Sequence, residues 1–294
     1  MNPLALALPA VVAIAAIALL RRSPLASKVL DRPGERSLHE IATPRIGGVG
    51  LMLGALPVAF VLGTPEVRAL ALTAAALALV SLVDDAKPLP VAVRLPFHFA
   101  ASAVAVAVAW PQGAAPEAGT LAGAALALLA IAWMTNLYNF MDGADGLAGG
   151  MATIGFATLG LAALGAGDGA MGHACLATAA AAAGFLAFNF PPARVFMGDA
   201  GSVPLGFLAG ALGWLGAARG LWPAWFPVLV FSPFVVDASV TLARRIRGRE
   251  PILQAHRSHY YQRLVLSGWS HRRLALASWG LMALCAASAL VALG

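Results

Sequence analysis

Charged residues are scarce in this chain of 294 residues: Asp, Glu, Lys and Arg make up 11% of it, against 60% for apolar residues. A soluble globular domain carries about 25% charged residues, so this chain lacks the charge to cover a surface in water. Several apolar runs approach the ~20 residues that cross the hydrocarbon of a bilayer. The composition therefore excludes an ordinary soluble domain and predicts an all-α polytopic membrane protein.

Cysteine is scarce too. Only Cys175 and Cys285 are present, both inside apolar runs, and there is no CxxC pair or Cys/His cluster with zinc spacing. We interpret both as small core residues rather than as metal ligands or a disulfide. A basic segment before the first apolar run is also missing, and Arg21 and Arg22 follow that run instead. The run is therefore typical of a retained membrane span rather than a cleaved signal peptide.

Ten apolar runs are candidate membrane spans. They cover residues 4–20, 47–62, 69–83, 95–110, 120–137, 147–165, 171–190, 201–216, 223–243 and 274–293. No soluble domain, long linker or internal repeat separates them, so we predict a single domain over residues 1–294. The lack of a repeat argues against a transporter built from inverted repeats.

The gaps between these spans form two alternating sets. One contains 21–46, 84–94, 138–146, 191–200 and 244–273, and the other contains 63–68, 111–119, 166–170 and 217–222. The first set holds 17 of the 19 Lys and Arg residues, and the second holds only Arg68 and Arg219. The positive-inside rule then places the first set in the cytoplasm and both termini outside. The net charge of +6 indicates loops that face anionic lipid rather than a nucleic-acid partner.

Five aspartates lie in the first set of gaps or at its edge: Asp84, Asp85, Asp142, Asp145 and Asp199. Carboxylates are costly near a bilayer and persist there mostly where they bind ions, relay protons or do chemistry. Alternation of the spans brings all five to the same side, together with the basic loops. The pattern predicts a metal–phosphate site at a membrane surface.

The adjacent aspartates Asp84 and Asp85 end the third span. Neighbouring residues point about 100° apart on a helix, so one can meet a metal while the other meets a substrate or Lys87. Acidic groups at a helix C-terminus oppose the helix dipole, which disfavours a merely solvated helix end.

Four polar side chains recur at a spacing of three from the end of the fifth span onward: Asn136, Asn139, Asp142 and Asp145. A 3₁₀ turn would align them on one side. Amide and carboxylate groups suit a nucleotide base, a ribose or a hydrated metal. The segment does not match an EF-hand loop, which needs a closing Glu.

Asp199 lies in a Gly-containing loop that opens into the eighth span. A helix N-terminus with small residues offers N–H groups and a positive dipole end to phosphate. Asp199 is alternatively the N-cap of that span, and the two roles are compatible.

Cationic side chains occur in two further segments. On a helix, His256 and Arg263 share a face and His259 lies about 60° away, which predicts a stripe that binds phosphate oxygens. Arg45 precedes the second span and either reaches a phosphate or anchors the boundary. We interpret Arg244, Arg245, Arg247 and Arg249 mainly as positive-inside anchors. Asp237 lies inside a span, and we expect it to have a structural role with a partner.

Taken together, the motifs "HEIATPRIGG", "DDAKPLP", "NLYNFMDGADGL", "VFMGDAGS" and "AHRSHYYQRL" resemble the polyprenyl-phosphate N-acetylhexosamine-1-phosphate transferase superfamily. This superfamily includes the phospho-N-acetylmuramoyl-pentapeptide transferases. The five motifs occur in the family's order along the whole chain. The C-terminal motif lacks three consecutive histidines, which argues against the pentapeptide substrate and favours the type that initiates O-antigen or exopolysaccharide.

The resemblance implies a ten-span enzyme of the bacterial inner membrane with its active site facing the cytoplasm. It would transfer a sugar 1-phosphate from a UDP-N-acetyl amino sugar to undecaprenyl phosphate and release UMP. The cofactor would be Mg²⁺, with Mn²⁺ as a substitute, and a homodimer stays open. The donor sugar is also open.

The resemblance also assigns roles to individual residues. Asp199 would bind the metal, with Asp85 completing the shell, and Phe196 would lie near the uracil. Asp84 and Asp85 would lie near the lipid phosphate. Asn139, Asp142 and Asp145 would lie near the nucleotide and the metal, with Asn136 in the same motif. His256, His259 and Arg263 would bind the sugar diphosphate.

Two mechanisms are compatible with these residues. In one, the lipid phosphate attacks the UDP-sugar directly, positioned or deprotonated by Asp84; in the other, an aspartate attacks first and forms a covalent intermediate. The non-enzymatic alternative is an ion-coupled transporter. It would need ionisable groups near the middle of the membrane, where only Asp237 is a candidate.

Overall fold

The computed structural model of the chain describes residues 3–34, 38, 41–110, 117–251 and 256–294. His39, Glu40 and Ala255, which belong to the motifs quoted above, lie outside these residues. The longer helices are α1 (Pro3–Leu20), α3 (Gly47–Leu62), α4 (Pro65–Ala86), α5 (Val91–Val108), α6 (Ala118–Phe140), α7 (Leu147–Gly165), α8 (Gly169–Asn189), α9 (Asp199–Ala218), α11 (Ser232–Arg247) and α13 (His271–Leu293). The chain is predominantly helical, as predicted.

Short elements connect these helices. They are the helices α2 (Pro24–Lys28), α10 (Trp225–Val230) and α12 (Tyr260–Leu266), with the strands β1 (Leu30–Asp31) and β2 (Thr43–Pro44). The two strands pair antiparallel, with Leu30 opposite Pro44. This small hairpin lies inside the gap 21–46, where the sequence shows no alternation long enough to predict strands.

Membrane spans can be assigned by length and composition. Among the described residues, seven helices are long and apolar enough to cross a membrane, namely α4 to α9 and α13. The apolar parts of α1 and α3, Ala7–Leu20 and Gly47–Leu62, are shorter. The chain is therefore a polytopic membrane protein, and the expected total of ten spans stays a prediction.

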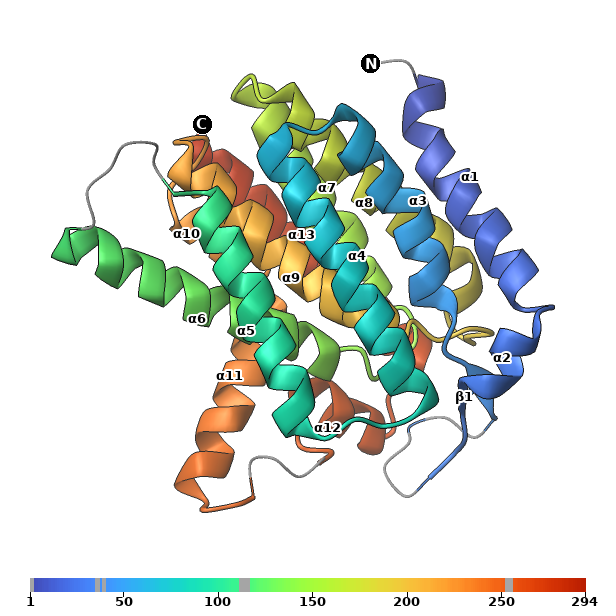
Figure 1. The fold of residues 1–294 in the computed structure, drawn as a ribbon. Helices are drawn as coiled ribbons and strands as arrows, with labels where there is room; N and C mark the ends of the chain where they lie inside the picture. Colours follow the sequence, from blue (N-terminus) through green and yellow to red (C-terminus); the bar gives the residue numbers. More distant parts are fainter. Residues whose placement is uncertain (1–2, 35–37, 39–40, 111–116, 252–255) are drawn as a thin grey trace.

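The ninth predicted span, 223–243, is not one continuous helix. α10 ends at Val230 and α11 begins at Ser232, and Pro233 lies in the first turn of α11. Proline has no N–H to donate and fits the first turn of a helix, so a new helix starts here instead of the old one continuing. In Figure 1, α11 and α6 project away from the other helices.

The connections gather at two ends of the bundle. Figure 1 shows β1, α2, α12 and the α4–α5 connection at one end, while the chain begins and finishes at the other. The first end carries the gaps that contain 17 of the 19 basic residues. The structure thus brings the basic gaps together, as the alternation of spans predicted.

Small residues allow the central helices to approach closely. α7, α8 and α9 are the most buried of the candidate spans, with 61–83% of their apolar windows inside the protein. A Cβ on Gly48 would collide with the Gly201 backbone, so the start of α3 lies directly against the start of α9. This contact fixes where the N-terminus of α9 lies, at the basic end of the bundle.

At the opposite end, Arg219 ties three connections together. Its guanidinium donates to Asp168 Oδ2 at 2.7 Å, to Glu66 Oε2 at 2.9 Å and to Thr64 Oγ1 at 3.0 Å. Asp168 also caps α8 through the Met171 N–H at 2.9 Å. Arg219 is one of the two basic residues in the second set of gaps. Its position there is explained because Asp168 and Glu66 neutralise its charge within the protein.

We therefore expect Arg219→Met to lower the free energy of unfolding by about 1–2 kcal/mol, since it leaves two carboxylates without their shared partner. Thermal unfolding in detergent measures this. Arg68→Met is the matched control, because exposed Arg68 makes only a 3.4 Å hydrogen bond to the Val61 carbonyl. Equal unfolding midpoints for the two variants would contradict the proposed role of the network.

Candidate active site

Asp85 fastens α4 to the N-terminus of α9. Its Oδ1 accepts a hydrogen bond from the Asp199 N–H at 3.1 Å, and its Oδ2 accepts one from the Ala200 N–H at 3.0 Å. A carboxylate in this position satisfies unpaired N–H groups and faces the positive end of the helix dipole. Asp199 is thus not the N-cap of α9: Gly198 occupies that position and Asp85 supplies the capping oxygens.

Gly198 makes room for this arrangement. Its φ is +74°, a conformation that side chains rarely adopt, and a Cβ there would lie 2.7 Å from Asp85 Oδ2. A larger residue would therefore strain the backbone and displace the capping carboxylate. The Gly-Asp pair of the "VFMGDAGS" motif is explained by this close approach.

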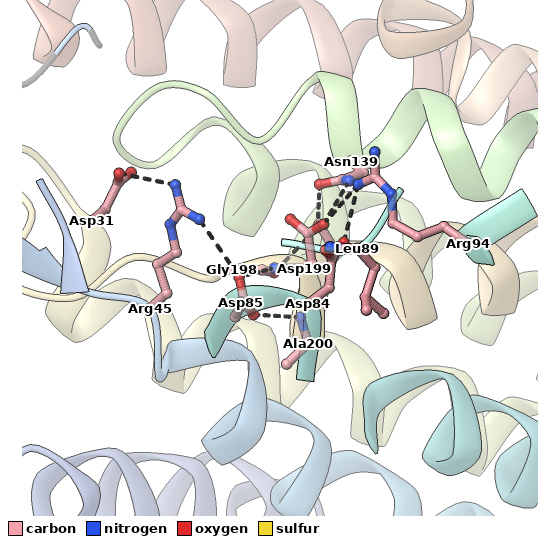
Figure 2. A network of polar contacts seen from close by, with 11 residues as sticks. Asp31, Arg45, Asp84, Asp85, Leu89, Arg94, Asn139, Gly198, Asp199 and Ala200 are labelled. Carbon is pink, nitrogen blue, oxygen red and sulfur yellow. Dashed lines mark hydrogen bonds and ion pairs between the residues drawn. The ribbon is translucent and has the colours of Figure 1, made fainter. Parts of the chain in front are cut away.

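Arg94 of α5 joins two of the carboxylates. Its Nη1 lies 3.1 Å from Asp84 Oδ2 and 3.4 Å from Asp199 Oδ2, as Figure 2 shows. Asp84 Oδ1 accepts a further hydrogen bond from the Leu89 N–H at 2.6 Å. Both oxygens of Asp84 are thus held in place, and Arg94 partly compensates the negative charge.

Asn139 contacts the same aspartate from α6. Its Nδ2 donates to Asp199 Oδ2 at 3.2 Å, and its Oδ1 accepts from the Ser202 hydroxyl at 2.9 Å. Helices α4, α5, α6 and α9 therefore all contribute polar side chains to one cluster around Asp199 (Figure 2).

Arg45 approaches the cluster from the β2–α3 connection. It pairs with Asp31 Oδ1 at 2.9 Å and lies 3.9 Å from Asp85 Oδ1. Its segment is fixed by backbone bonds to the loop before α9: the Phe196 N–H donates to the Pro44 carbonyl at 3.0 Å, and the Gly47 N–H donates to the Phe196 carbonyl at 2.9 Å. The structure therefore brings a second cation to the carboxylates.

Arg45, Asn139 and Asp199 of this cluster border a cavity of about 110 Å³. Asp31, Arg45, Asn139, Asp142, Asp145, Asn189, Phe196, Asp199 and His271 are among its lining residues. Asp145 accepts a hydrogen bond from the Ala193 N–H at 2.9 Å and lies 3.3 Å from His271 Nδ1. The cavity is small, polar and strongly charged.

Asp142 lies in the loop after α6, and its surroundings disfavour the ionised form of its carboxyl group. Burial raises the pKa of its carboxyl well above the usual value, and the nearby carboxylates of Asp199 and Asp85 raise it further. Like charges in a poorly solvated site repel one another unless a cation or a proton intervenes. The loop therefore holds a carboxylate that a bound cation would stabilise.

The C-terminal motif is placed differently from the expected phosphate-binding stripe. His259 is buried, with 4% of its surface exposed, and its Nδ1 lies 3.2 Å from Asp237 Oδ1. Asp237 also accepts the N–H groups of Tyr260 at 2.9 Å and Tyr261 at 3.1 Å. Asp237 thus has a partner within the protein, as expected, and this partner is His259.

His256 and Arg263 do not line the cavity of Asp199 either. His256 bonds with the Ser258 hydroxyl at 2.8 Å, and burial, then Arg245 and His259, lower its pKa to about 4. It is therefore neutral near pH 7 and would bind phosphate as a hydrogen-bond donor. Arg263 lies over the Tyr260 ring, 5.8 Å from its centroid.

Two further predicted residues lie at the margin of the cluster. Asn136 donates to the Ala132 carbonyl at 2.8 Å and hydrogen-bonds with His98. Lys87 follows the last residue of α4 and its side chain is exposed. Neither borders the cavity, although both lie beside residues of the cluster.

Sequence reasoning missed four residues that the structure places at the site: Asp31, Arg94, Asn189 and His271. Arg94 offered a signal, because it is an arginine at the start of an apolar run close to the paired aspartates. Asp31 lies in "DRPG", which reads only as a turn. Asn189 and His271 reach the site through long-range contacts that no local pattern encodes.

The donor set can be compared with the needs of Mg²⁺. Within the described parts of the chain, no three His, Cys, Asp or Glu side chains are arranged to hold a metal ion. Mg²⁺ usually takes one or two protein carboxylates and completes its shell with substrate phosphates and water. The carboxylates of Asp199 and Asp142 border the same cavity, and Asp142 is unfavourable without a cation. The residues therefore fit a Mg²⁺–phosphate site.

A family model matches the part of the chain that carries most of this cluster. Residues 67–217, half of the chain, match the family model described as glycosyl transferase family 4, and the chain belongs to this family. The matched region contains Asp84, Asp85, Arg94, Asn139 and Asp199. Arg45 and the C-terminal motif lie outside it.

Curated relatives extend over most of the chain. A probable undecaprenyl-phosphate N-acetylglucosaminyl 1-phosphate transferase of Bacillus subtilis is 29% identical, covering 86% of this chain and 74% of its own. A decaprenyl-phosphate N-acetylglucosaminephosphotransferase of Mycobacterium tuberculosis is 29% identical over 88% and 75%. A phospho-N-acetylmuramoyl-pentapeptide-transferase of Moorella thermoacetica is 30% identical over 93% and 92%. The resemblance found from the motifs is thus confirmed at the level of the superfamily.

Asp85→Ala should destabilise the protein by about 1–2 kcal/mol, because two N–H groups of α9 lose their acceptor. Thermal unfolding in detergent checks this. Glu117→Ala is the control, since Glu117 also precedes a helix but makes no capping bond there. An unchanged unfolding midpoint for Asp85→Ala would show that the cap does not hold α9.

Asp142→Asn should stabilise the protein near neutral pH when divalent cations are removed with EDTA. A raised pKa in the folded state means that stability falls as pH increases from the ordinary Asp value of ~3.9 toward the raised one. The amide variant avoids this loss, and the two proteins should converge at acidic pH, where Asp142 is protonated in both states. Unfolding midpoints measured across pH test this, and a destabilised variant at neutral pH would contradict it.

Proposed function

We propose that this protein transfers an N-acetylated amino-sugar 1-phosphate from a UDP-sugar to undecaprenyl phosphate, with release of UMP. The observation that carries the proposal is the convergence of Asp84, Asp85, Asp142 and Asp199 on one end of an apolar bundle, beside Arg45 and Arg94. The names of the B. subtilis and M. tuberculosis relatives support a polyprenyl phosphate acceptor and favour N-acetylglucosamine as the sugar. The product would initiate a cell-surface glycan.

The location follows from the same arrangement. The charged end of the bundle carries most of the basic residues, so the positive-inside rule favours a cytoplasmic active site in a bacterial plasma membrane. Cytoplasmic UDP-sugar could then enter from water while the polyprenyl chain stays in the bilayer. A transporter is the weaker alternative, because Asp237, its candidate ionisable group within a span, is engaged by His259 and two backbone N–H groups.

The chemistry requires one bond to form and one to break. An oxygen of the lipid phosphate attacks the β-phosphorus of the UDP-sugar, and the bond between this phosphorus and the UMP oxygen breaks. Such transfers depend mainly on positioning and on neutralising charge. Arg45 and Arg94 can bind phosphate oxygens from opposite sides of Asp199 (Figure 2). Phe196 borders the same cavity and offers an aromatic ring to the uracil.

A bound Mg²⁺ would supply further neutralisation of phosphate charge, and Asp199 with Asp142 would hold it. Asp85 is the weaker candidate ligand, because both of its oxygens already accept backbone hydrogen bonds. Its contribution is to keep Asp199 at the start of α9. Of the diphosphate ligands predicted in the C-terminal motif, His259 is buried against Asp237. His256 and Arg263 do not border the Asp199 cavity, and their role stays a prediction.

Direct attack is the mechanism that the geometry supports better. Both Asp84 oxygens are engaged, one by the Leu89 N–H and one by Arg94, so Asp84 is poorly placed to become a nucleophile. A phosphate monoester has a second pKa of about 6, so it is largely a dianion at pH 7 and needs little help from a base. Asp84 would therefore orient Arg94 toward the lipid phosphate.

The test is to incubate purified protein with undecaprenyl phosphate, Mg²⁺ and a panel of UDP-sugars that includes UDP-N-acetylglucosamine. We expect release of UMP, and Asp199→Asn should reduce turnover by at least ~10³-fold because a group that neutralises transition-state charge is lost. Glu117→Gln, an exposed carboxylate outside the site, is the control.

Three results would contradict the proposal. Release of UDP would indicate an ordinary glycosyltransferase, and no nucleotide release with any donor would exclude the reaction. Full activity of Asp199→Asn would exclude the metal assignment. A phospho-sugar covalently attached to the protein in the absence of lipid phosphate would replace direct attack by the two-step mechanism.

A further inference from the structure

Helix α13 contacts one wall of the charged cavity from outside. Residues 142–145 all border the cavity, and they lead to Gly146, the N-cap residue of α7. The Trp279 side chain of α13 donates its indole N–H to the Gly146 carbonyl at 2.9 Å. Trp279 itself is not one of the described residues that line the cavity. Any influence that it has on the site therefore passes through the loop formed by residues 142–146.

Gly146 is held through both of its backbone polar groups. Its N–H donates to Asn189 Oδ1 at 2.8 Å, and the Asn189 side chain in turn donates to the Val195 carbonyl at 3.0 Å. Its carbonyl also accepts the Gly150 N–H at 3.0 Å, within the first turn of α7. The φ of Gly146 is +74°, which glycine adopts at little cost. Residues of α7, α8 and α13 thus meet at the end of the 142–146 loop.

Packing fixes the direction of the Trp279 N–H. A Cβ on Gly150 would collide with the indole nitrogen, and the Phe190 ring lies 5.5 Å from the Trp279 ring between centroids. Trp279 lies about 12 Å along α13 from its first residue, His271, and α13 is a candidate membrane span. Water is scarce at such a depth, so an indole N–H that loses its acceptor there stays unpaired. The contact with Gly146 is therefore difficult to exchange for another.

The same helix contacts the preceding loop residue. His271 Nδ1 lies 3.3 Å from Asp145 Oδ1 and 3.3 Å from the Asp145 backbone nitrogen. The other carboxylate oxygen of Asp145 accepts the Ala193 N–H at 2.9 Å. His271 borders the cavity and could touch a ligand directly. Trp279 is therefore the residue through which a positioning effect of α13 can be separated from binding.

The 142–146 loop belongs to the nucleotide side of the proposed reaction. It shares its cavity with Phe196, the aromatic ring available to uracil. Asp84 and Arg94, which we placed beside the lipid phosphate, are not among the described residues that line this cavity. A loop that is already ordered avoids the entropy cost of being fixed when its ligand binds. Displacement of the loop should therefore weaken binding of the nucleotide and leave the lipid acceptor unaffected.

We propose that Trp279 is a positioning residue for nucleotide binding, because its hydrogen bond to Gly146 holds the 142–146 loop in the conformation that accepts the UDP-sugar. This inference rests on the proposed function, which assigns the cavity to the nucleotide. It gives a membrane-embedded tryptophan a role in a step that takes place at the charged end of the bundle.

The test compares Trp279→Phe with Trp222→Phe in the full-length protein. Trp222 donates the same kind of bond, from its indole N–H to the Gly213 carbonyl at 3.0 Å, but it lies in the opposite set of gaps. Equilibrium dialysis with UMP and Mg²⁺ should show a dissociation constant raised roughly fivefold by Trp279→Phe and unchanged by Trp222→Phe. The KM for UDP-N-acetylglucosamine should rise by the same factor, while the KM for undecaprenyl phosphate stays unchanged.

A second pair of variants moves the indole rings without altering them. Gly150→Ala should displace Trp279 and weaken UMP binding in the same way, and it carries the comparison if Trp279→Phe does not fold. Gly216→Ala is its control, because a Cβ there would collide with the Trp222 ring. Thermal unfolding of all four variants in detergent shows how far each one destabilises the fold.

Three results would overturn the inference while leaving the proposed function intact. They are UMP binding as tight in Trp279→Phe and Gly150→Ala as in the wild type, equal weakening by the Trp222 and Gly216 variants, and an equal rise in the KM for undecaprenyl phosphate. The second result would indicate a general loss of stability. A wild type that binds no UMP would instead overturn the proposed function, and this inference with it.

Discussion

The charged end of this protein depends on the carboxylate of Asp85 at the N-terminus of α9. It accepts the N–H groups of Asp199 and Ala200 and thereby holds α9 against the end of α4. The same contact requires Gly198, whose positive φ leaves space for the carboxylate. Asp199 can then face Arg94 and Asn139. A single capping interaction thus places the central carboxylate among four helices.

Neighbouring cations offset part of the free-energy cost of burying these carboxylates. Buried carboxylates are unfavourable unless hydrogen bonds, cations or protons compensate their charge. Here Arg94 lies between Asp84 and Asp199, and Arg45 lies between Asp31 and Asp85. The compensation is incomplete at Asp142, where burial and neighbouring carboxylates raise the pKa. An excess of negative charge at one point is what a cation-dependent phosphate site requires.

Much of the fold follows from the sequence alone. Apolar runs near the length of a bilayer give the helices, and the alternation of basic gaps gives the end at which the site forms. The break at Ser232 was harder to foresee, because the apolar run continues through Pro233 and only local geometry stops the helix. The strands β1 and β2 were also unpredictable, since two residues are too few to show alternation.

The site was predictable where residue chemistry is unusual for its surroundings. Aspartates between apolar runs stand out, and the structure brings Asp84, Asp85, Asp142 and Asp199 to one region. Residues defined by tertiary contact were not predictable: His271 reaches Asp145 across more than one hundred residues, and the partner of Asp237 is His259, 22 residues further along the chain. Helical periodicity placed His259 on a cationic stripe, but periodicity does not show which face packs against a neighbouring helix.

The central claim is that these carboxylates form a site for a divalent cation and a phosphate. Its most direct test is the thermal unfolding midpoint of purified protein titrated with Mg²⁺ in the presence of UMP. A ligand that binds only the folded state stabilises it by RT ln(1 + [L]/Kd), so this midpoint keeps rising with the logarithm of the ligand concentration above Kd. We expect such a rise with Mg²⁺ for the wild type and none for Asp199→Asn. An equal rise in both proteins, or no rise in either, would contradict the account.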